Sequence, residues 1–140
     1  MKKYKFLDHT ADVLFEAYGK TLNELFTNSA LALEETQVDL KDVKQKTKHI
    51  IKLKKDSIEM LLFDFLQELI YLKDKDLLLF SKFKVDIKKN KHFGLKAECF
   101  GEKINYKKHE LKVDVKAVTL HEFYVKKTKD KWEAHVILDI

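Results

Sequence analysis

In the stretch SIEMLLFDFLQELI, residues 57–70, apolar side chains recur every three or four positions. The resulting stripe consists of Ile58, Leu61, Leu62, Phe65, Leu66, Leu69 and Ile70. A stripe of this width is typical of a helix that buries one face in a core. Asp56 or Ser57 precedes it, and either side chain can act as the N-cap. The stretch therefore predicts a core helix against which the rest of the chain packs.

A second helix is predicted upstream of the first. Thr21 followed by Glu24 has the spacing of a capping box, which satisfies free amide groups at the start of a helix. The residues that follow at helical spacing are Leu22, Leu25, Phe26, Ser29, Ala32 and Leu33. We expect this helix to end near Glu35.

Most of the remaining apolar residues alternate with polar ones, as they do in strands. The predicted strands are 4–7, 13–18, 49–53, 77–88, 93–100, 111–118, 122–127 and 132–139. Asn90 and Gly101 suit the turns between the later strands. Strands and helices alternate early and strands dominate late. This order favours an α+β fold, with two helices packed on a mixed or antiparallel sheet, over a doubly wound fold.

Length and composition predict a single domain over residues 1–140. The chain has 140 residues with 45% hydrophobic content, which is enough to bury one core. No apolar run approaches the roughly 18 residues of a membrane span, and the first residues do not resemble a signal peptide. We therefore expect a cytoplasmic protein without a membrane partner. The only cysteine, Cys99, has no partner for a disulfide or a zinc site, and we expect it to be buried as a small hydrophobic residue.

The basic charge of the chain comes from lysine alone. The formal net charge is +5, and all 28 basic residues are lysine. Arginine is the residue that binds phosphates and guanine edges through two parallel hydrogen bonds. A positive charge that comes only from lysine is therefore weak support for sequence-specific nucleic-acid recognition. A solvated surface and an electrostatic attraction toward an RNA-bearing partner both remain open. With only three glycines, a P-loop or a Rossmann fingerprint is excluded.

The segment DHTAD, residues 8–12, places two carboxylates and an imidazole in a short connection between two predicted strands. Carboxylate oxygens are the preferred ligands of Mg²⁺, Mn²⁺ and Ca²⁺, but one loop rarely supplies all of them. The alternative is a local turn in which Asp8 or Asp12 accepts hydrogen bonds from nearby backbone amides and His9 is a satisfied partner.

The end of the chain offers a second contributor. The predicted strand 132–138 runs directly into Asp139 and Ile140. If these residues are held in the fold, the carboxylate of Asp139 and the main-chain carboxylate of Ile140 lie side by side and favour a cation between them. The alternative is a surface terminus on which Ile140 is simply packed.

The other histidines carry weaker signals. Residues 107–110 bring two lysines, His109 and Glu110 together, but such a run is equally expected in a solvated turn. The His121 and Glu122 pair fits either a site or a strand junction. His49, His92 and His135 have no metal-ligand spacing, so we expect surface or core roles for them.

Several strings together resemble one protein family, the archeases. They are DHTAD at 8–12, FEAYG at 15–19, LFDFL at 62–66, KHE at 108–110, VKAVT at 115–119 and VILDI at 136–140. Their order and spacing cover essentially the whole chain, which makes the resemblance specific although each string alone is weak.

The resemblance implies a non-catalytic accessory protein that activates an RtcB-type RNA ligase. Archeases promote guanylylation of the ligase histidine and multiple turnover in tRNA splicing, so tRNA or RNA ends are reached through the ligase. Carried over to this sequence, the family's metal site falls on Asp12, Asp139 and the main-chain carboxylate of Ile140, with Ca²⁺, Mg²⁺ or Mn²⁺ as the ion. Asp8, His9 and His109 match family strings without an assigned role.

Two other classes of function remain as alternatives. The lysines and the aromatic residues are compatible with an RNA-binding or chaperone-like module that acts on tRNA or on RNA-modifying proteins. A metal-dependent hydrolase would use Asp8, His9 and Asp12, and it would require turnover by the isolated protein.

Overall fold

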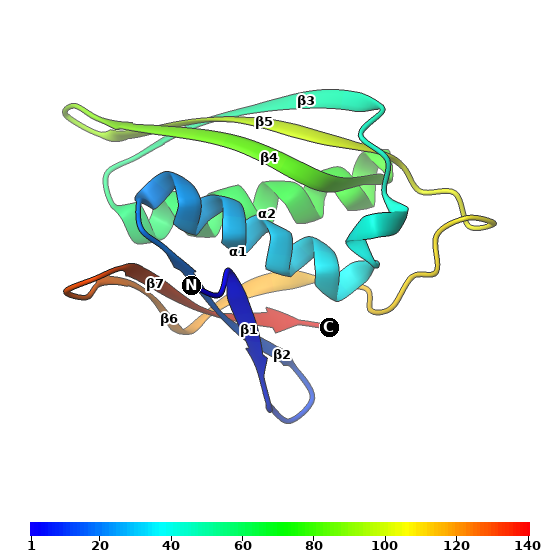
Figure 1. Cartoon of the computed structure of the whole chain (residues 1–140), viewed down its shortest axis with the longest axis horizontal. Coiled ribbons are helices and arrows are strands. Elements are labelled where there is room, and N and C mark those ends of the chain that lie inside the picture. Colours follow the sequence, from blue (N-terminus) through cyan, green and yellow to red (C-terminus); the bar gives the residue numbers. More distant parts are fainter.

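Two helices lie between two antiparallel sheets in this computed structural model, which describes all 140 residues (Figure 1). The four-stranded sheet has the order β1-β2-β7-β6, and the three-stranded sheet has the order β3-β5-β4. The elements are β1 (Tyr4–Leu7), β2 (Val13–Gly19), α1 (Leu22–Gln37), a 3₁₀ turn (Leu40–Asp42), β3 (Thr47–Lys55), α2 (Ile58–Asp76), β4 (Leu78–Lys89), β5 (Phe93–Lys103), β6 (Ala117–Lys127) and β7 (Trp132–Asp139). Neither helix has the length and apolar character that crossing a membrane requires.

Both helices begin at the caps that the sequence predicts. The Thr21 hydroxyl accepts a hydrogen bond from the Glu24 amide at 3.1 Å, and the Ser57 hydroxyl accepts one from the Met60 amide at 3.2 Å. These bonds satisfy amides that have no partner within the helix. The helix α1 continues to Gln37, slightly beyond the predicted end near Glu35.

The α+β class is confirmed, but the strands divide into two sheets where the sequence suggested one. The main core cluster contains 26 buried residues drawn from both helices and both sheets. Because each helix has a sheet on two sides, its buried surface is wider than a single stripe. Phe26 and Ala30 of α1 are fully buried together with Leu33, for example.

Two predicted strand features are wrong. In residues 111–118, only a bridge between Leu111 and Val38 precedes the start of β6 at Ala117. The extended segment bonds to helix ends instead, since the Lys112 amide donates to the Gln37 carbonyl at 2.8 Å. Gly101 lies within β5 and not in a turn. Its hydrogen faces the β4 backbone, where an added Cβ would lie 1.8 Å from the Leu79 carbonyl oxygen.

The interior position predicted for Cys99 is confirmed, since the residue has no exposed surface. Burial, with a smaller contribution from Glu34, raises the pKa of its thiol to about 12 from 9.0. Because the thiolate is the reactive form, labelling of the folded protein by a disulfide reagent should be about 1,000-fold slower than labelling of the unfolded chain at the same pH. Absorbance measurements with and without urea test this expectation, and rapid labelling of the folded protein would contradict it.

Candidate functional site

Residues 8–12 form the exposed turn between β1 and β2, at the tip of the four-stranded sheet (Figure 1). The last pair before the turn is Leu7 with Leu14. Ala11 has a φ of 67°, a left-handed conformation that costs energy for a residue with a Cβ atom. His9 Nδ1 lies 3.5 Å from Asp12 Oδ2, and the two side chains are 30% and 32% exposed. The turn thus presents an imidazole and a carboxylate together to solvent.

The sheet register brings Asp12 and Asp139 to the same end of two neighbouring strands. β2 and β7 pair from Gly19 with Trp132 through Val13 with Leu138. The pairing ends there, so Asp12 directly precedes the paired part of β2 and Asp139 is the last residue of β7. The backbone of Asp139 is fixed from the other side, where its carbonyl accepts a hydrogen bond from the Lys116 amide at 2.8 Å. Two residues that are remote in sequence therefore lie at the same end of two paired strands, and Ile140 follows directly.

The donor groups at this end of the sheet suit a hard cation. Asp12 and Asp139 supply carboxylate oxygens, and the predicted third donor, the main-chain carboxylate of Ile140, supplies oxygen as well. Such donors favour Ca²⁺, Mg²⁺ or Mn²⁺ over zinc. No group of three His, Cys, Asp or Glu side chains in the structure is arranged to hold a metal ion. Side chains alone therefore do not complete a metal site at this end of the sheet.

A hollow of about 430 Å³ lies beside the turn. Phe6, Leu7, Val13 and Leu14 give it an apolar side, while Glu35, at the end of α1, and Lys112 also line it. The Lys112 ammonium donates a hydrogen bond to the Glu35 carbonyl at 3.1 Å. The hollow therefore combines apolar walls with charged groups of both signs, and neither Glu35 nor Lys112 was singled out by the sequence.

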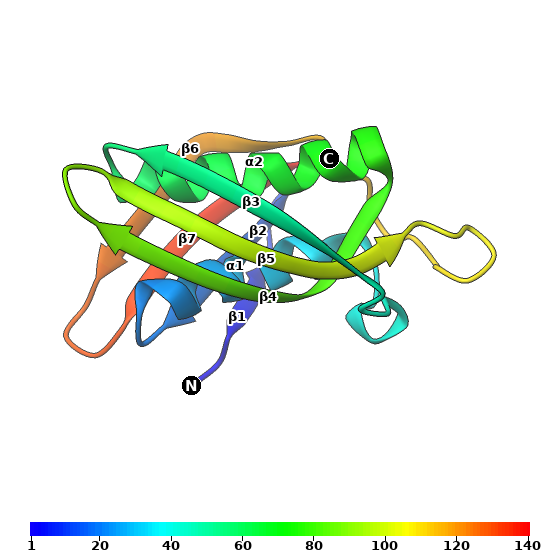
Figure 2. The same ribbon diagram turned by 90° about the horizontal axis from the view of Figure 1, so that it is seen from above.

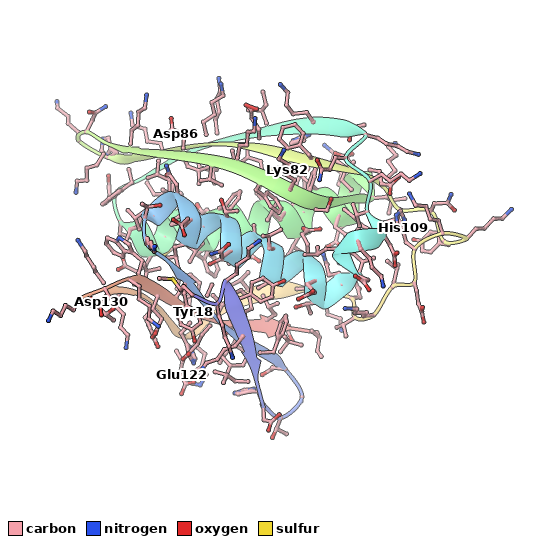
Figure 3. The ribbon with its side chains drawn as sticks, in the orientation of Figure 1. Tyr18, Lys82, Asp86, His109, Glu122 and Asp130 are labelled. Atoms are coloured by element: carbon pink, nitrogen blue, oxygen red, sulfur yellow. The ribbon has the colours of Figure 1, made fainter.

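His109 is a buried structural residue. Its side chain has no exposed surface, although the neighbouring Lys107, Lys108 and Glu110 are exposed. Its Nδ1 accepts a hydrogen bond from the Asn105 amide at 2.9 Å, so the opposite nitrogen carries the proton and donates to Glu102 Oε2 at 3.0 Å. The imidazole fixes the turn at residues 105–109, which lies at the right of Figure 3.

Glu102 is the centre of this second cluster. It also accepts hydrogen bonds from the Lys108 ammonium at 2.6 Å and from the Lys44 amide at 2.7 Å. Desolvation of Glu102 opposes its ionisation, but the Lys108 ammonium and the other donors outweigh it and lower the pKa of this carboxyl to about 2. The cluster therefore ties the turn at residues 105–109 to Glu102 at the end of β5.

The remaining histidines belong to no group of side chains that could hold a metal ion. His121 and Glu122 are exposed on β6, and Glu122 adopts a left-handed φ of 53° where the β6–β7 register shifts. His135 packs against the Tyr124 ring with centroids 5.1 Å apart, and His92 pairs with Asp56. The partly buried positions of His49, His92 and His135 agree with the surface and core roles expected for them, whereas His121 lies within β6 and not at a strand junction.

A buried polar network was missed by the sequence analysis. Glu34 of α1 is fully buried, and its Oε1 accepts a hydrogen bond from the Phe80 amide of the edge strand β4 at 2.9 Å. Lys73 of α2 pairs with Asp114 and donates to the Val115 carbonyl at 2.9 Å, which ties residues 112–116 to the helix. A sequence signal for Glu34 existed, because it follows Phe26 and Ala30 at four-residue steps along one face of α1.

A family profile described as "Archease protein family (MTH1598/TM1083)" matches residues 4–140 of this chain. Among individual relatives, the protein archease of Methanosarcina barkeri is 41% identical over 141 residues, which cover 99% of this chain and 97% of the relative. The protein archease of Pyrococcus furiosus is 37% identical over the full length of both chains.

Two solved structures share the fold. The solution structure of Methanobacterium thermoautotrophicum protein 1598 superposes with a TM-score of 0.89, at 38% identity and full coverage of both chains. A crystal structure from Thermotoga maritima, described as an archease and possible chaperone, has a TM-score of 0.64 at 20% identity and covers 97% of this chain and 96% of its own.

Proposed function

This chain belongs to the archease family, and we propose that it is a cytoplasmic accessory protein that activates an RtcB-type RNA ligase in tRNA splicing. In this role it promotes guanylylation of the ligase and its multiple turnover without catalysing ligation itself. The observation that supports the proposal most is the acidic tip, which we define as Asp12 and Asp139 together with the end of the chain at Ile140.

In the proposed mechanism, Asp12, Asp139 and the main-chain carboxylate of Ile140 hold a divalent cation, Ca²⁺, Mg²⁺ or Mn²⁺. When bound, this ion would supply positive charge close to the phosphoryl groups that the ligase transfers. The chain's own residues provide its placement. Pairing of β2 with β7 aligns the two aspartates, and the Lys116 amide fixes the backbone of Asp139.

The hollow beside the tip offers a docking position for the ligase. Phe6, at its apolar side, is 44% exposed, and His9 stands at its edge next to Asp12. A ligase segment with apolar side chains would bury Phe6 and bring the acidic tip close to the ligase active site. The positively charged Lys112 in the same hollow would pair with an acidic group of that segment.

Replacement of either aspartate tests this proposal. Asp12→Asn and Asp139→Asn each remove one charged ligand and keep the shape of the side chain, so we expect stimulation of multiple-turnover ligation to fall on the order of 100-fold. The measurement is the turnover of the cognate ligase on RNA halves with each variant added. Asp130→Asn is the matched control, because it removes the same charge from the β6–β7 turn, away from the tip (Figure 3). Full activation by both tip variants would refute the role of the tip, and no activation by the parent chain would refute the function.

A chaperone-like role toward an RNA-modifying protein is the second candidate. The Thermotoga maritima relative is described as a possible chaperone, and this chain exposes Leu120 to 59% as well as Phe6 to 44%. Such a role depends on apolar surface and not on a cation. Suppression of the aggregation of an RNA-modifying enzyme that persists in Asp12→Asn and is lost in Phe6→Ser would favour it.

A further inference from the structure

The outer face of the β3–β5–β4 sheet is covered by no other element (Figure 2). The inner face carries the core residues, such as Ile51, Leu95 and Phe83, and packs on the helices. Side chains alternate between the two faces of a strand, and residues paired across an antiparallel sheet share a face. The pairing register therefore identifies the outward residues in rows across the three strands, and we call this surface the lysine face.

Seven lysines occupy the lysine face. They are Lys48, Lys52 and Lys54 on β3, Lys96 on β5, and Lys82, Lys84 and Lys88 on β4. The only acidic residues among them are Asp86 and Glu98. The excess of five positive charges equals the formal net charge of the whole chain, +5. Elsewhere in the molecule the lysines and the carboxylates balance, so the entire charge excess is gathered on one surface.

These charges are left largely unpaired. Lys88 is the only one of the seven with a carboxylate oxygen within 4.0 Å, namely that of Asp86 at 3.9 Å. Lys52 stands directly opposite Lys96 in the β3–β5 register. Like charges in directly opposed positions destabilise a sheet. This pair is unfavourable, whereas Lys84 stands opposite Glu98 and Lys96 also stands opposite Asp86 in the β4–β5 register, so the positive charge of the lysine face is only partly offset within the sheet.

An aromatic ring and a hollow lie among the lysines. Phe100 is partly exposed between Lys48 and Lys82 in one row, and the Lys82 and Lys84 ammonium groups lie 5.6 and 6.0 Å from its ring centroid. Further along the sheet, Gly94 has no side chain, and lysines surround a hollow of about 560 Å³. Lys82 and Asp86 mark this outer surface in Figure 3.

We propose that the lysine face binds single-stranded RNA, with the lysines along the sugar-phosphate backbone and Phe100 stacked on a base. Lysines two positions apart on one strand are spaced by about 7 Å, so the strands present regular rows of positive charge to a polyanion. An aromatic ring within a basic surface is the usual arrangement for sequence-tolerant binding of single strands.

Only Phe100 and Ile50 are apolar on this face, which disfavours insertion into a membrane. An acidic peptide carries no base that could stack on the ring. This inference stands apart from ligase activation.

Binding of a short fluorescein-labelled oligouridylate, measured by anisotropy without any ligase, tests the proposal. If about five phosphates are neutralised, the affinity should fall about 100-fold between roughly 50 and 200 mM salt. Lys52→Glu should weaken binding at least about tenfold while the urea midpoint stays equal or rises, because the new carboxylate faces Lys96. Gly94→Glu should act similarly, since an added Cβ there meets nothing closer than the Lys88 carbonyl at 3.8 Å.

Lys129→Glu is the matched control, because it reverses one exposed lysine in the β6–β7 turn, outside the lysine face. It should bind oligouridylate within about twofold of the parent chain. Three results would overturn the proposal. They are absence of binding at low salt, an equal loss in Lys129→Glu and Lys52→Glu, and tighter binding of a polyglutamate peptide or of phosphatidylserine vesicles than of the oligouridylate.

Discussion

A Glu34→Gln variant is expected to exceed the parent chain in stability by about 4 kcal/mol at pH 9 and to match it near pH 5. Glu34 is fully buried, and burial raises the pKa of its carboxyl from 4.5 to about 8. The hydrogen bond from the Phe80 amide and the charge of Lys73 act in the opposite direction but do not outweigh the burial. Glutamine keeps the acceptor for the Phe80 amide and cannot ionise.

The direction of the effect follows from proton linkage. Below pH 4.5 the carboxyl is protonated in both the folded and the unfolded chain, so it adds no pH dependence. Between about pH 4.5 and 8 the unfolded chain loses this proton while the folded chain keeps it, and the free energy of unfolding falls by up to about 1.4 kcal/mol per pH unit. Above pH 8 the loss is complete. The difference in the free energy of unfolding between parent and variant therefore grows across this pH range, because all their other titrating groups are the same.

Urea unfolding at several pH values measures this difference. Glu35→Gln is the matched control, because it makes the same change at the next position of α1, where the side chain is only partly buried. A stability change shared by both variants would come from replacing a carboxylate in α1 and not from its burial. If the stability profile of Glu34→Gln ran parallel to that of the parent chain at every pH, the carboxyl would be ionised in the folded protein and the assignment of a neutral Glu34 would fail.

Glu34 also illustrates why part of the fold could not be predicted. The apolar stripes of both helices and their caps at Thr21 and Ser57 were local signals, and the structure confirms them. The division of the strands into two sheets was not encoded locally, because it depends on which strands pair. Once α1 lies between two sheets, even a carboxyl group that follows Phe26 and Ala30 along one face of the helix becomes buried, as Glu34 shows.

The strand predicted at 111–118 and the turn predicted at Gly101 were wrong for a related reason, whereas the strand predicted at 93–100 is confirmed by β5. Alternation correctly predicts an extended chain at Val113 and Val115, but it does not say whether the backbone bonds to a strand or to a helix end. In the structure, Lys73 and Gln37 provide those bonds. Gly101 suggested a turn by its residue type, whereas its position is explained by the close approach of the β4 backbone.

The acidic tip and the lysine face differ in how far the sequence alone predicts them. Asp12 directly precedes β2 and Asp139 ends β7, and the resemblance to archeases predicted that they belong to one site. The lysine face has no continuous motif, because its residues alternate with core residues on three strands. Only the pairing of Lys52 with Lys96, and of the rows beside it, reveals that the charge excess lies on one surface.

Calcium should stabilise the parent chain and leave the Asp12→Asn and Asp139→Asn variants unchanged. A ligand that binds only the folded state at 100 times its Kd adds about 2.7 kcal/mol to the free energy of unfolding. The measurement is the thermal midpoint with increasing Ca²⁺, and then with Mg²⁺ and Mn²⁺. Asp130→Asn should respond as the parent chain does, because it lies in the β6–β7 turn, outside the tip.

The same titration distinguishes a metal site from a structural role of the aspartates. Only a metal site reverses the sign of the difference in thermal midpoint between the parent chain and the variants. In the proposed site the carboxylates of Asp12 and Asp139 share one cation, so without the cation they would repel each other, and neutralising one of them should leave the midpoint equal or higher. With the cation, the parent chain should become the more stable protein, so the order of stability reverses as Ca²⁺ is added. Adding one glycine after Ile140 moves the main-chain carboxylate away and should weaken the response without abolishing it. If the variants were less stable than the parent chain at every cation concentration, the aspartates would be structural caps and the metal proposal would be wrong.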